Sequence, residues 1–506
     1  MNLASEHMII AGWILILAYA VVLISIVIKG ARKTKSIDDY AVGSVIFSPY
    51  AVGLSLAASI TSAATFIINP GFVALYGISG VLSMAIALPI AAIISLVILT
   101  KGFRKHGQSV KALTLAQWMQ SRYDSKSYGL FFAFLSMLLL TFIVLICVGL
   151  TKVISSTLAV PEFYALLGIV IFVFGYMMYG GANSMVYTNT IQAVLMLIVA
   201  FILLGSGYEH FREGVFGFME KLESIDPKLI QSTNDQSFLF RDFYEIFVAQ
   251  IIVGVAIICQ PHILTKSLLL KNDKDVNTYL WVGGSVQMLF FLVVITGLYI
   301  RIAFPDLQAA GEAIPMDGLV SAYVVSEFPV FVGLLLVMGL LSAGLSTLEG
   351  LIQSLSTTIT QDILKPLAPR LFEKDANRQI FINKMVIVAL AIATIFVSWD
   401  QLINPKLSVG IFAQNGVYAY FSAAFIPILL GTFHPKVTLK AVFTASVTAV
   451  VIHFSMYYLR LPVPFTEATG ENPGVAASTA ILVSIIVAFL VMHFDRSELP
   501  EKGQES

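Results

Sequence analysis

Long apolar segments alternate with short polar ones along almost the whole chain. They reach the length of about twenty residues that an α-helix needs to cross the hydrocarbon core of a bilayer. The segments lie at residues 8–28, 47–72, 80–101, 128–157, 160–180, 185–207, 243–265, 277–301, 327–359, 380–398, 404–431, 437–459 and 475–494. Runs of this length exclude an outer-membrane barrel, whose strands are about ten alternating residues long. The pattern predicts an all-α polytopic membrane protein with about thirteen spans.

The composition agrees with this class. Hydrophobic residues make up 58% of the chain and charged residues 12%, and the mean hydropathy is +0.88. The 30 Lys and Arg are balanced by 30 Asp and Glu, so no basic surplus points to nucleic acid. Cys147 and Cys259 fall inside apolar segments, where a free thiol behaves as a small hydrophobe. The first segment is too long for a signal-peptide core, so we expect it to remain as a span.

The basic residues predict the orientation. With the N-terminus outside, most of the 30 Lys and Arg fall in segments that face the cytoplasm, as the positive-inside rule requires. We therefore expect a multi-pass protein of the cell membrane, the inner membrane in a bacterium, with a short cytoplasmic tail after Phe494. The acidic segment 209–242 would then lie outside and cover the surface without binding a ligand.

Two spans contain interruptions. The span at 51–71 ends in NPG at residues 69–71, and the span at 243–264 ends in QPHIL at residues 260–264. Their prolines free backbone carbonyl groups. The two spans are five apart and run in opposite directions, which is typical of an inverted repeat with ion and substrate sites between the interrupted helices. Helices rich in small residues can also be plain packing surfaces.

The repeat divides the chain into five predicted parts. These are an extra N-terminal span with a basic loop (1–44), the first repeat of five helices (45–208), the external acidic segment (209–242), the second repeat (243–432), and two C-terminal spans with a short tail (433–506).

The segment 342–359, SAGLSTLEGLIQSLSTTI, carries many oxygen atoms within an apolar span. Ala343, Ser346, Thr347 and Gly350 share one helix face, which combines hydroxyls with small side chains and so predicts a cation site. A single hydroxyl would only bond back to the preceding turn. Glu349 lies in the same segment, and an intramembrane carboxylate must be paired, protonated or bound to an ion.

Five motifs in order resemble the sodium/solute symporter family, from about Ile37 to about Val450. They are DDY at 38–40, VGLSLAASITSAATFIINPGFVALYG at 52–77, YGGANSMVYTNTIQ at 179–192, QPHILTKS at 260–267 and SAGLSTLEGLIQSLSTTITQDI at 342–363. The chain looks like a bacterial member near the proline, acetate and pantothenate permeases and the sodium-coupled monocarboxylate and vitamin carriers. The resemblance implies a leucine-transporter fold, five plus five core helices, sodium as the coupling ion, and a carrier rather than an enzyme.

The resemblance also implies the main sodium site. Two carbonyl groups of the first core helix and one carbonyl with two hydroxyls of the eighth bind the ion in the family. The matching positions are Ala58 and Thr61, then Ala343, Ser346 and Thr347. A hard monovalent cation is well served by such oxygens.

A second sodium site occurs in some branches, and here the chain departs from the pattern. Ser346, Glu349 and Gly350 match on the eighth core helix, but Asn189 stands where an Asp is expected on the fifth. Our hypothesis is that the acid has moved between helices, so that Glu349 faces Asn189 and keeps a cation or proton site. The alternative is that the Glu349 side chain extends to the cytoplasmic surface.

The substrate contacts implied are polar residues of the first, sixth and tenth core helices. They are Ser62, Thr65, Gln260, His262, Gln414, Asn415 and Tyr418. The two amides at 414 and 415 have the alternative role of bonding between helices. No Arg or Lys occurs in the middle of a predicted span, so a substrate carboxylate would be held by helix N-termini, amide and hydroxyl donors, and the bound cation.

Proline carriers of the family have an Asp and an Arg at the positions of Ile60 and Val45, and sugar carriers have a Gln at Thr65. We therefore expect a sodium-coupled symporter that imports a small monocarboxylate, such as acetate, lactate, pyruvate or a pantothenate-like compound, by alternating access. The alternatives are a proline-like amino-acid symporter and a proton-coupled carrier that uses Glu349. A channel would need a polar pore with rings of charge, which the pattern lacks.

Overall fold

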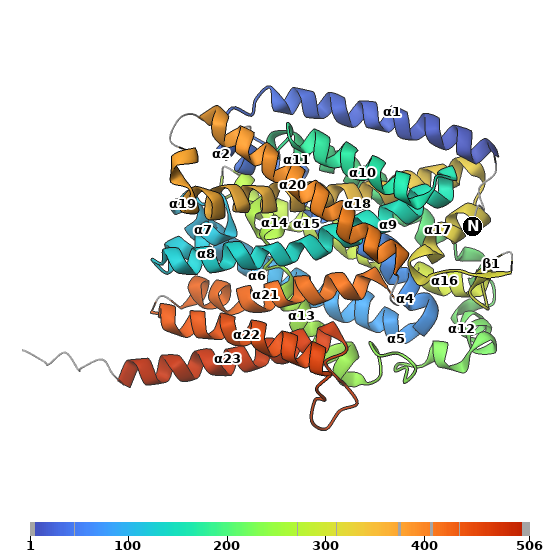
Figure 1. Cartoon of the computed structure of the whole chain (residues 1–506). Helices are drawn as coiled ribbons and strands as arrows, with labels where there is room; N and C mark the ends of the chain where they lie inside the picture. The colour runs from blue at the N-terminus through green and yellow to red at the C-terminus, as the bar shows by residue number, and fades with distance from the viewer. Residues whose placement is uncertain are drawn as a thin grey trace, which may run out of the picture.

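Long apolar helices lie side by side in one bundle (Figure 1). The computed structural model describes residues 6–44, 46–270, 272–309, 311–372, 376–404, 408–434 and 436–497. Val45 and the tail from residue 498 lie outside the described residues. The first eleven helices are α1 (Glu6–Ala31), α2 (Ile37–Val42), α3 (Pro49–Ile60), α4 (Asn69–Tyr76), α5 (Ile78–Val81), α6 (Leu88–Ser109), α7 (Leu115–Arg122), α8 (Lys126–Leu135), α9 (Leu140–Leu158), α10 (Glu162–Met177) and α11 (Ala182–Gly205).

The second half of the chain is also helical and contains one short hairpin. Its helices are α12 (Gly214–Ile225), α13 (Gln250–Ile257), α14 (Pro261–Leu264), α15 (Asp275–Leu292), α16 (Thr296–Ala303), α17 (Leu319–Glu327), α18 (Val330–Thr358), α19 (Lys365–Leu367), α20 (Ala376–Ile403), α21 (Val409–Phe433), α22 (Leu439–Leu459) and α23 (Pro473–Ser497). Strands β1 (Gln308–Ala309) and β2 (Glu312–Ala313) pair antiparallel, with Gln308 opposite Ala313.

Short π and 3₁₀ turns connect or extend these helices. The π turns are η1 (Ala64–Ile68), η2 (Leu82–Ala87), η6 (Tyr244–Ala249) and η10 (Ile359–Leu364). The 3₁₀ turns are η3 (Ser136–Leu139), η4 (Tyr208–Phe211), η5 (Pro227–Ile230), η7 (Thr265–Leu269), η8 (Val293–Ile295), η9 (Met316–Gly318) and η11 (Pro369–Leu371).

The predicted all-α membrane architecture is confirmed. Among the described residues, 10 helices are long and apolar enough to cross a membrane, or up to 12 if each of two bent pairs is one span. The predicted span at 160–180 corresponds to the shorter apolar helix α10, which has 16 residues. The count of thirteen spans therefore stays a prediction.

Both predicted interruptions are present. The segment from α3 through η1 to α4 bends by 54°, and the segment from η6 and α13 to α14 and η7 bends by 57°. The second break directly precedes Pro261, as predicted. The first lies between Ile60 and Ala64, several residues before Pro70, so the proline was the wrong marker for its position. Pro70 instead is the second residue of α4, in the first turn of a helix, where a missing N–H is tolerated.

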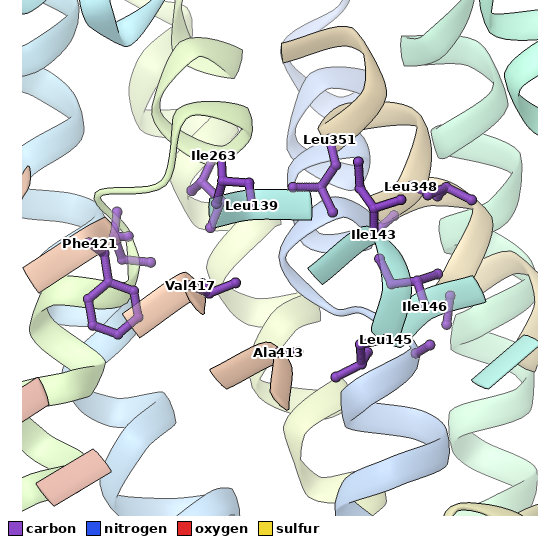
Figure 2. Close-up of a cluster of buried hydrophobic side chains, with 14 of the residues drawn as sticks. Leu139, Ile143, Leu145, Ile146, Ile263, Leu348, Leu351, Ala413, Val417 and Phe421 are labelled. Atoms are coloured by element: carbon purple, nitrogen blue, oxygen red, sulfur yellow. The ribbon is translucent and has the colours of Figure 1, made fainter. Parts of the chain in front are cut away.

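The core is centred on α18 and α21. In the described residues, 78% of the most apolar part of the α18 span is buried, against 11% for α1, which lies along one edge of the bundle (Figure 1). Figure 2 shows a buried apolar cluster to which α9, α14, α18 and α21 all contribute, with Ile143, Ile263, Leu348 and Val417 among its members. Apolar packing thus joins α14, which is part of the second broken segment, to α9, α18 and α21.

The acidic segment packs against the bundle. It forms the 12-residue helix α12 between the short turns η4 and η5. Phe218, Leu222 and Leu229 are buried. The Asn234 side chain donates to the carbonyl of Tyr76 at the end of α4, at a distance of 3.3 Å. The segment is thus packed against the end of the first broken helix.

Close packing between α3 and α15 gives a test of the fold. A Cβ atom on Gly53 would lie 2.9 Å from the Tyr279 carbonyl oxygen, whereas one on Gly168 in α10 would meet nothing within 4 Å. We expect Gly53→Ala to lower the free energy of unfolding by about 1–3 kcal/mol, because the backbone must shift. The control Gly168→Ala should leave it unchanged or raise it by up to about 1 kcal/mol. Thermal unfolding of the detergent-purified protein measures both; equal melting temperatures would contradict the packing.

Candidate cation and substrate sites

The last turn of α3 meets the hydroxyls of α18. Since α3 ends at Ile60, the carbonyl groups of its last turn have no following helical turn to bond to. Ser346 Oγ donates to the Ala58 carbonyl oxygen at 2.8 Å. Thr347 Oγ1 lies 3.1 Å from the Ser59 carbonyl oxygen and 3.4 Å from that of Ala58. The broken helix thus presents free carbonyl oxygens to two buried hydroxyls.

Ala343 completes this cluster from within α18. Its carbonyl oxygen accepts from Ser346 Oγ at 3.1 Å and from Thr347 Oγ1 at 3.4 Å. Thr61 follows directly on α3 in an extended conformation, and its buried hydroxyl has no hydrogen-bond partner among the described residues. Four of the five predicted sodium ligands therefore converge, with Thr61 next to them. The carbonyl of Ser59 is a contact that the sequence did not indicate.

Carbonyl and hydroxyl oxygens are hard, uncharged ligands that suit an alkali cation. All the groups in the cluster are buried in an apolar bundle. A dehydrated ion there would keep oxygen ligands in place of its water shell, and the oxygens that now bond to one another would become those ligands. The chemistry of the donor set fits sodium, whose binding at these residues stays a prediction.

Glu349 is buried between α18, α10 and α11. Its Oε1 accepts from the Tyr176 hydroxyl at 2.7 Å and from Gln192 Nε2 at 3.1 Å, and its Oε2 accepts from Thr188 Oγ1 at 2.5 Å. The Asn189 amide lies beside it, with its nitrogen 3.1 Å from Glu349 Oε2 in the orientation that pairs donors with acceptors. Glu349 therefore faces Asn189, as the swap hypothesis places it, and does not extend to the surface.

Gly350 leaves space at the same place. A Cβ atom on it would be 3.6 Å from the Cβ of His262 and 3.7 Å from Ser59 Oγ. The face of α18 that carries Ser346 and Gly350 is therefore opposite both broken helices. Whether a cation or proton binds at the Asn189–Glu349 pair stays a prediction.

Lys266 is a buried polar residue that the sequence reasoning missed. Its position after the seventh predicted span suggested a cytoplasmic loop, yet its side chain is only 2% exposed. Lys266 Nζ donates to the Ser55 carbonyl oxygen at 2.8 Å and to Ser55 Oγ at 2.7 Å. The QPHILTKS motif was the sequence feature that could have indicated this burial. It continues past the break into α14 and η7, and η7 carries Lys266 into the bundle.

A cavity of about 100 Å³ lies beside the cation cluster. Six of the seven predicted substrate residues line it: Ser62, Thr65, Gln260, His262, Gln414 and Tyr418. Asn415 does not. Its side chain and backbone carbonyl bond to His453 Nε2 at 3.1 and 3.0 Å, and its amide nitrogen is 3.4 Å from the Tyr458 hydroxyl. Asn415 thus takes the alternative role of bonding between helices.

Most of the cavity wall is apolar, and the polar side chains in it are uncharged. Gln260 Oε1 and both ring nitrogens of His262 are buried and have no partner among the described residues. Phe142 and Phe291 contribute apolar surface, and no Lys, Arg, Asp or Glu of the described chain lines the cavity. Buried polar atoms without protein partners are available to a bound solute.

Broken helices in the two halves of the chain, with an oxygen cluster and a cavity between them, are typical of a secondary carrier coupled to a cation. Residues 40–449 match the Sodium:solute symporter family. The chain belongs to this family of sodium-coupled membrane symporters.

Individual relatives agree with this assignment. The chain is 25% identical to a sodium/pantothenate symporter of Escherichia coli over 96% of this chain and 97% of that one. It is 27% identical to a sodium/proline symporter of Salmonella typhimurium over 79% and 78%. A solved outward-open structure of a Na⁺-coupled sialic acid symporter superposes with a TM-score of 0.76 at 16% identity, covering 95% of this chain and 97% of that one. The expected family, sodium coupling and leucine-transporter fold are confirmed.

The hydroxyl pair should carry sodium-dependent stability. A ligand that binds only the folded state raises stability with its concentration. We expect sodium to raise the melting temperature of the purified protein relative to choline, and Ser346→Ala with Thr347→Ala to abolish that shift. The control is Thr151→Ala in α9, which removes a buried hydroxyl bonded only to its own helix, at Cys147. Persistence of the full sodium shift in the double variant would contradict the site.

Proposed function

We propose that this symporter imports an organic monocarboxylate together with sodium. The cation binds at Ala58, Thr61, Ala343, Ser346 and Thr347, and the solute binds in the adjoining cavity. The observation that carries the proposal is the uncharged cavity beside an uncharged cation cluster. A carboxylate there has no fixed cationic partner in the cavity wall, so the co-bound sodium supplies the balancing charge and each ligand favours the binding of the other.

The few polar side chains in the cavity wall support a substrate with hydrogen-bonding groups besides its carboxylate. Ser62, Thr65, Gln260 and Tyr418 offer hydroxyl and amide groups, while the phenylalanine rings favour an apolar portion. A sodium/pantothenate symporter is among the relatives that match almost the whole chain. Pantothenate combines one carboxylate with an amide, hydroxyls and a branched apolar part, and it is our first choice within the monocarboxylate class.

An amino-acid substrate is the second candidate, because sodium/proline symporters are also similar to this chain. Its ammonium group would need a counter-charge or several acceptors. Ile60 contributes an apolar side chain to the cavity wall where proline carriers have an Asp. This substitution favours the monocarboxylate.

The orientation proposed from the basic residues places the N-terminus outside and the C-terminus in the cytoplasm. In this orientation the two repeats, 45–208 and 243–432, move against each other while the extra helices remain at the edges. Sodium then enters from the side that carries the acidic segment, and its gradient supplies the free energy of uptake.

Uptake into proteoliposomes tests the substrate. We expect labelled pantothenate or a smaller monocarboxylate to accumulate with an inward sodium gradient and to stop without it. A proton gradient alone should not support uptake, which separates sodium coupling from a carrier driven through Glu349. Sodium-driven uptake of proline with no uptake of any monocarboxylate would overturn the proposal and favour the second candidate.

Two adjacent amides provide a matched test of the cavity. Gln414→Ala should raise the KM for the transported solute roughly two- to tenfold, the effect of one lost hydrogen bond. Asn415→Ala should leave KM unchanged and lower the melting temperature, because His453 loses its partner. The test measures KM and the melting temperature of both variants. A raised KM for Asn415→Ala with an unchanged KM for Gln414→Ala would contradict the cavity as the binding site.

A further inference from the structure

Lys266 has a complete set of oxygen partners inside the protein. Its ammonium group has three N–H donors. Ser55 provides two acceptors, its carbonyl oxygen at 2.8 Å and its hydroxyl at 2.7 Å. Asn189 Oδ1 provides the third at 3.0 Å. A ring of carbonyl, hydroxyl and amide oxygens is the surrounding that an alkali cation would require, and here a side-chain ammonium occupies it.

Asn189 connects this ammonium to the buried carboxylate. In the orientation that satisfies its neighbours, its oxygen faces Lys266 Nζ and Ser59 Oγ, each at 3.0 Å. Its nitrogen faces Glu349 Oε2 at 3.1 Å and Gln192 Oε1 at 2.9 Å. The amide therefore accepts on the cationic side and donates on the anionic side, which is the polarity that stabilises an ion pair bridged by one group.

Glu349 has its full complement of donors. Tyr176, Gln192, Thr188 and Asn189 each donate to one of its two oxygens. A carboxylate with this many donors is stabilised as the anion, because its lone pairs are all used. A buried anion also needs a balancing charge nearby. Lys266 provides that charge through the Asn189 bridge, so the pair is neutral as a unit.

This pair adjoins the proposed sodium site. Ser59 donates to the bridging Asn189, and its own carbonyl oxygen accepts from Thr347 Oγ1 at 3.1 Å. Ser55 and Ser59 are both on α3, and Lys266 follows the break that precedes α14. The network thus joins the two broken helices to α11 and α18, directly beside the cluster proposed to bind sodium.

We propose that the Lys266 ammonium is a resident cation that replaces a second transported ion, so that the carrier binds one sodium per cycle. Glu349 and Asn189 hold this ammonium and position α3 and α18; they do not bind a transported cation. The inference rests on the proposed sodium site at Ser346 and Thr347 and fixes the number of ions that accompany the substrate.

Equilibrium binding of radioactive sodium to the purified full-length protein, without any organic solute, tests the proposal. We expect one ion per wild-type molecule and one per Glu349→Gln molecule. Lys266→Arg, which keeps the charge, should also bind one. Lys266→Met leaves the Glu349 anion without its cation and should bind a second sodium, and adding Glu349→Gln to Lys266→Met should return the count to one.

Two sodium ions bound to the wild type would overturn the proposal, as would complete loss of sodium from Glu349→Gln. A count of one for Lys266→Met would also contradict it. If Lys266→Met does not fold, the wild type and Glu349→Gln still decide. Because no solute is present, failure of the monocarboxylate assignment does not affect the result. An error in the proposed sodium site itself would be recognised separately, because the double variant Ser346→Ala with Thr347→Ala would then still bind one ion.

Discussion

Polar groups in an apolar bundle must find partners inside the protein, and this constraint determines the centre of the structure. The break after Ile60 leaves carbonyl oxygens of α3 without amide partners in the next turn, and α18 supplies hydroxyls directly opposite. Neither the carbonyl oxygens of α3 nor the hydroxyls of α18 would provide enough ligands for a cation alone. Together they form a cluster of uncharged oxygens that is deeply buried, and the cavity and the lysine network are arranged around it.

The same contacts explain how binding at one place could affect the other. The cation cluster and the cavity share the broken segment between Ile60 and Thr65, so an ion that orders the break also orders the cavity wall. Such coupling is reciprocal for binding free energies. If one sodium accompanies one monocarboxylate, as proposed, the loaded carrier gains no net charge, and accumulation follows the sodium concentration gradient rather than the membrane potential.

The sequence was sufficient for features that depend on composition and spacing. Apolar segments of the right length located the helices, and the spacing of Ser346 and Thr347 placed both hydroxyls on the face that meets α3. The sequence was insufficient for the exact position of a helix break and for the direction in which a side chain points after it. Pro70 suggested a break that in fact occurs earlier, between Ile60 and Ala64. Lys266 follows a span in the sequence but is turned inward by η7. Gln414 and Asn415 are neighbours, yet helical rotation directs one to the cavity and the other to α22.

An experimental density map of the sodium-saturated protein tests the central claim most directly. We predict density for one ion coordinated by the Ala58 carbonyl oxygen and the hydroxyl oxygens of Ser346 and Thr347, with these oxygens no longer hydrogen-bonded to each other. Sodium density elsewhere in the bundle, with Ser346 Oγ still donating to Ala58, would contradict the account.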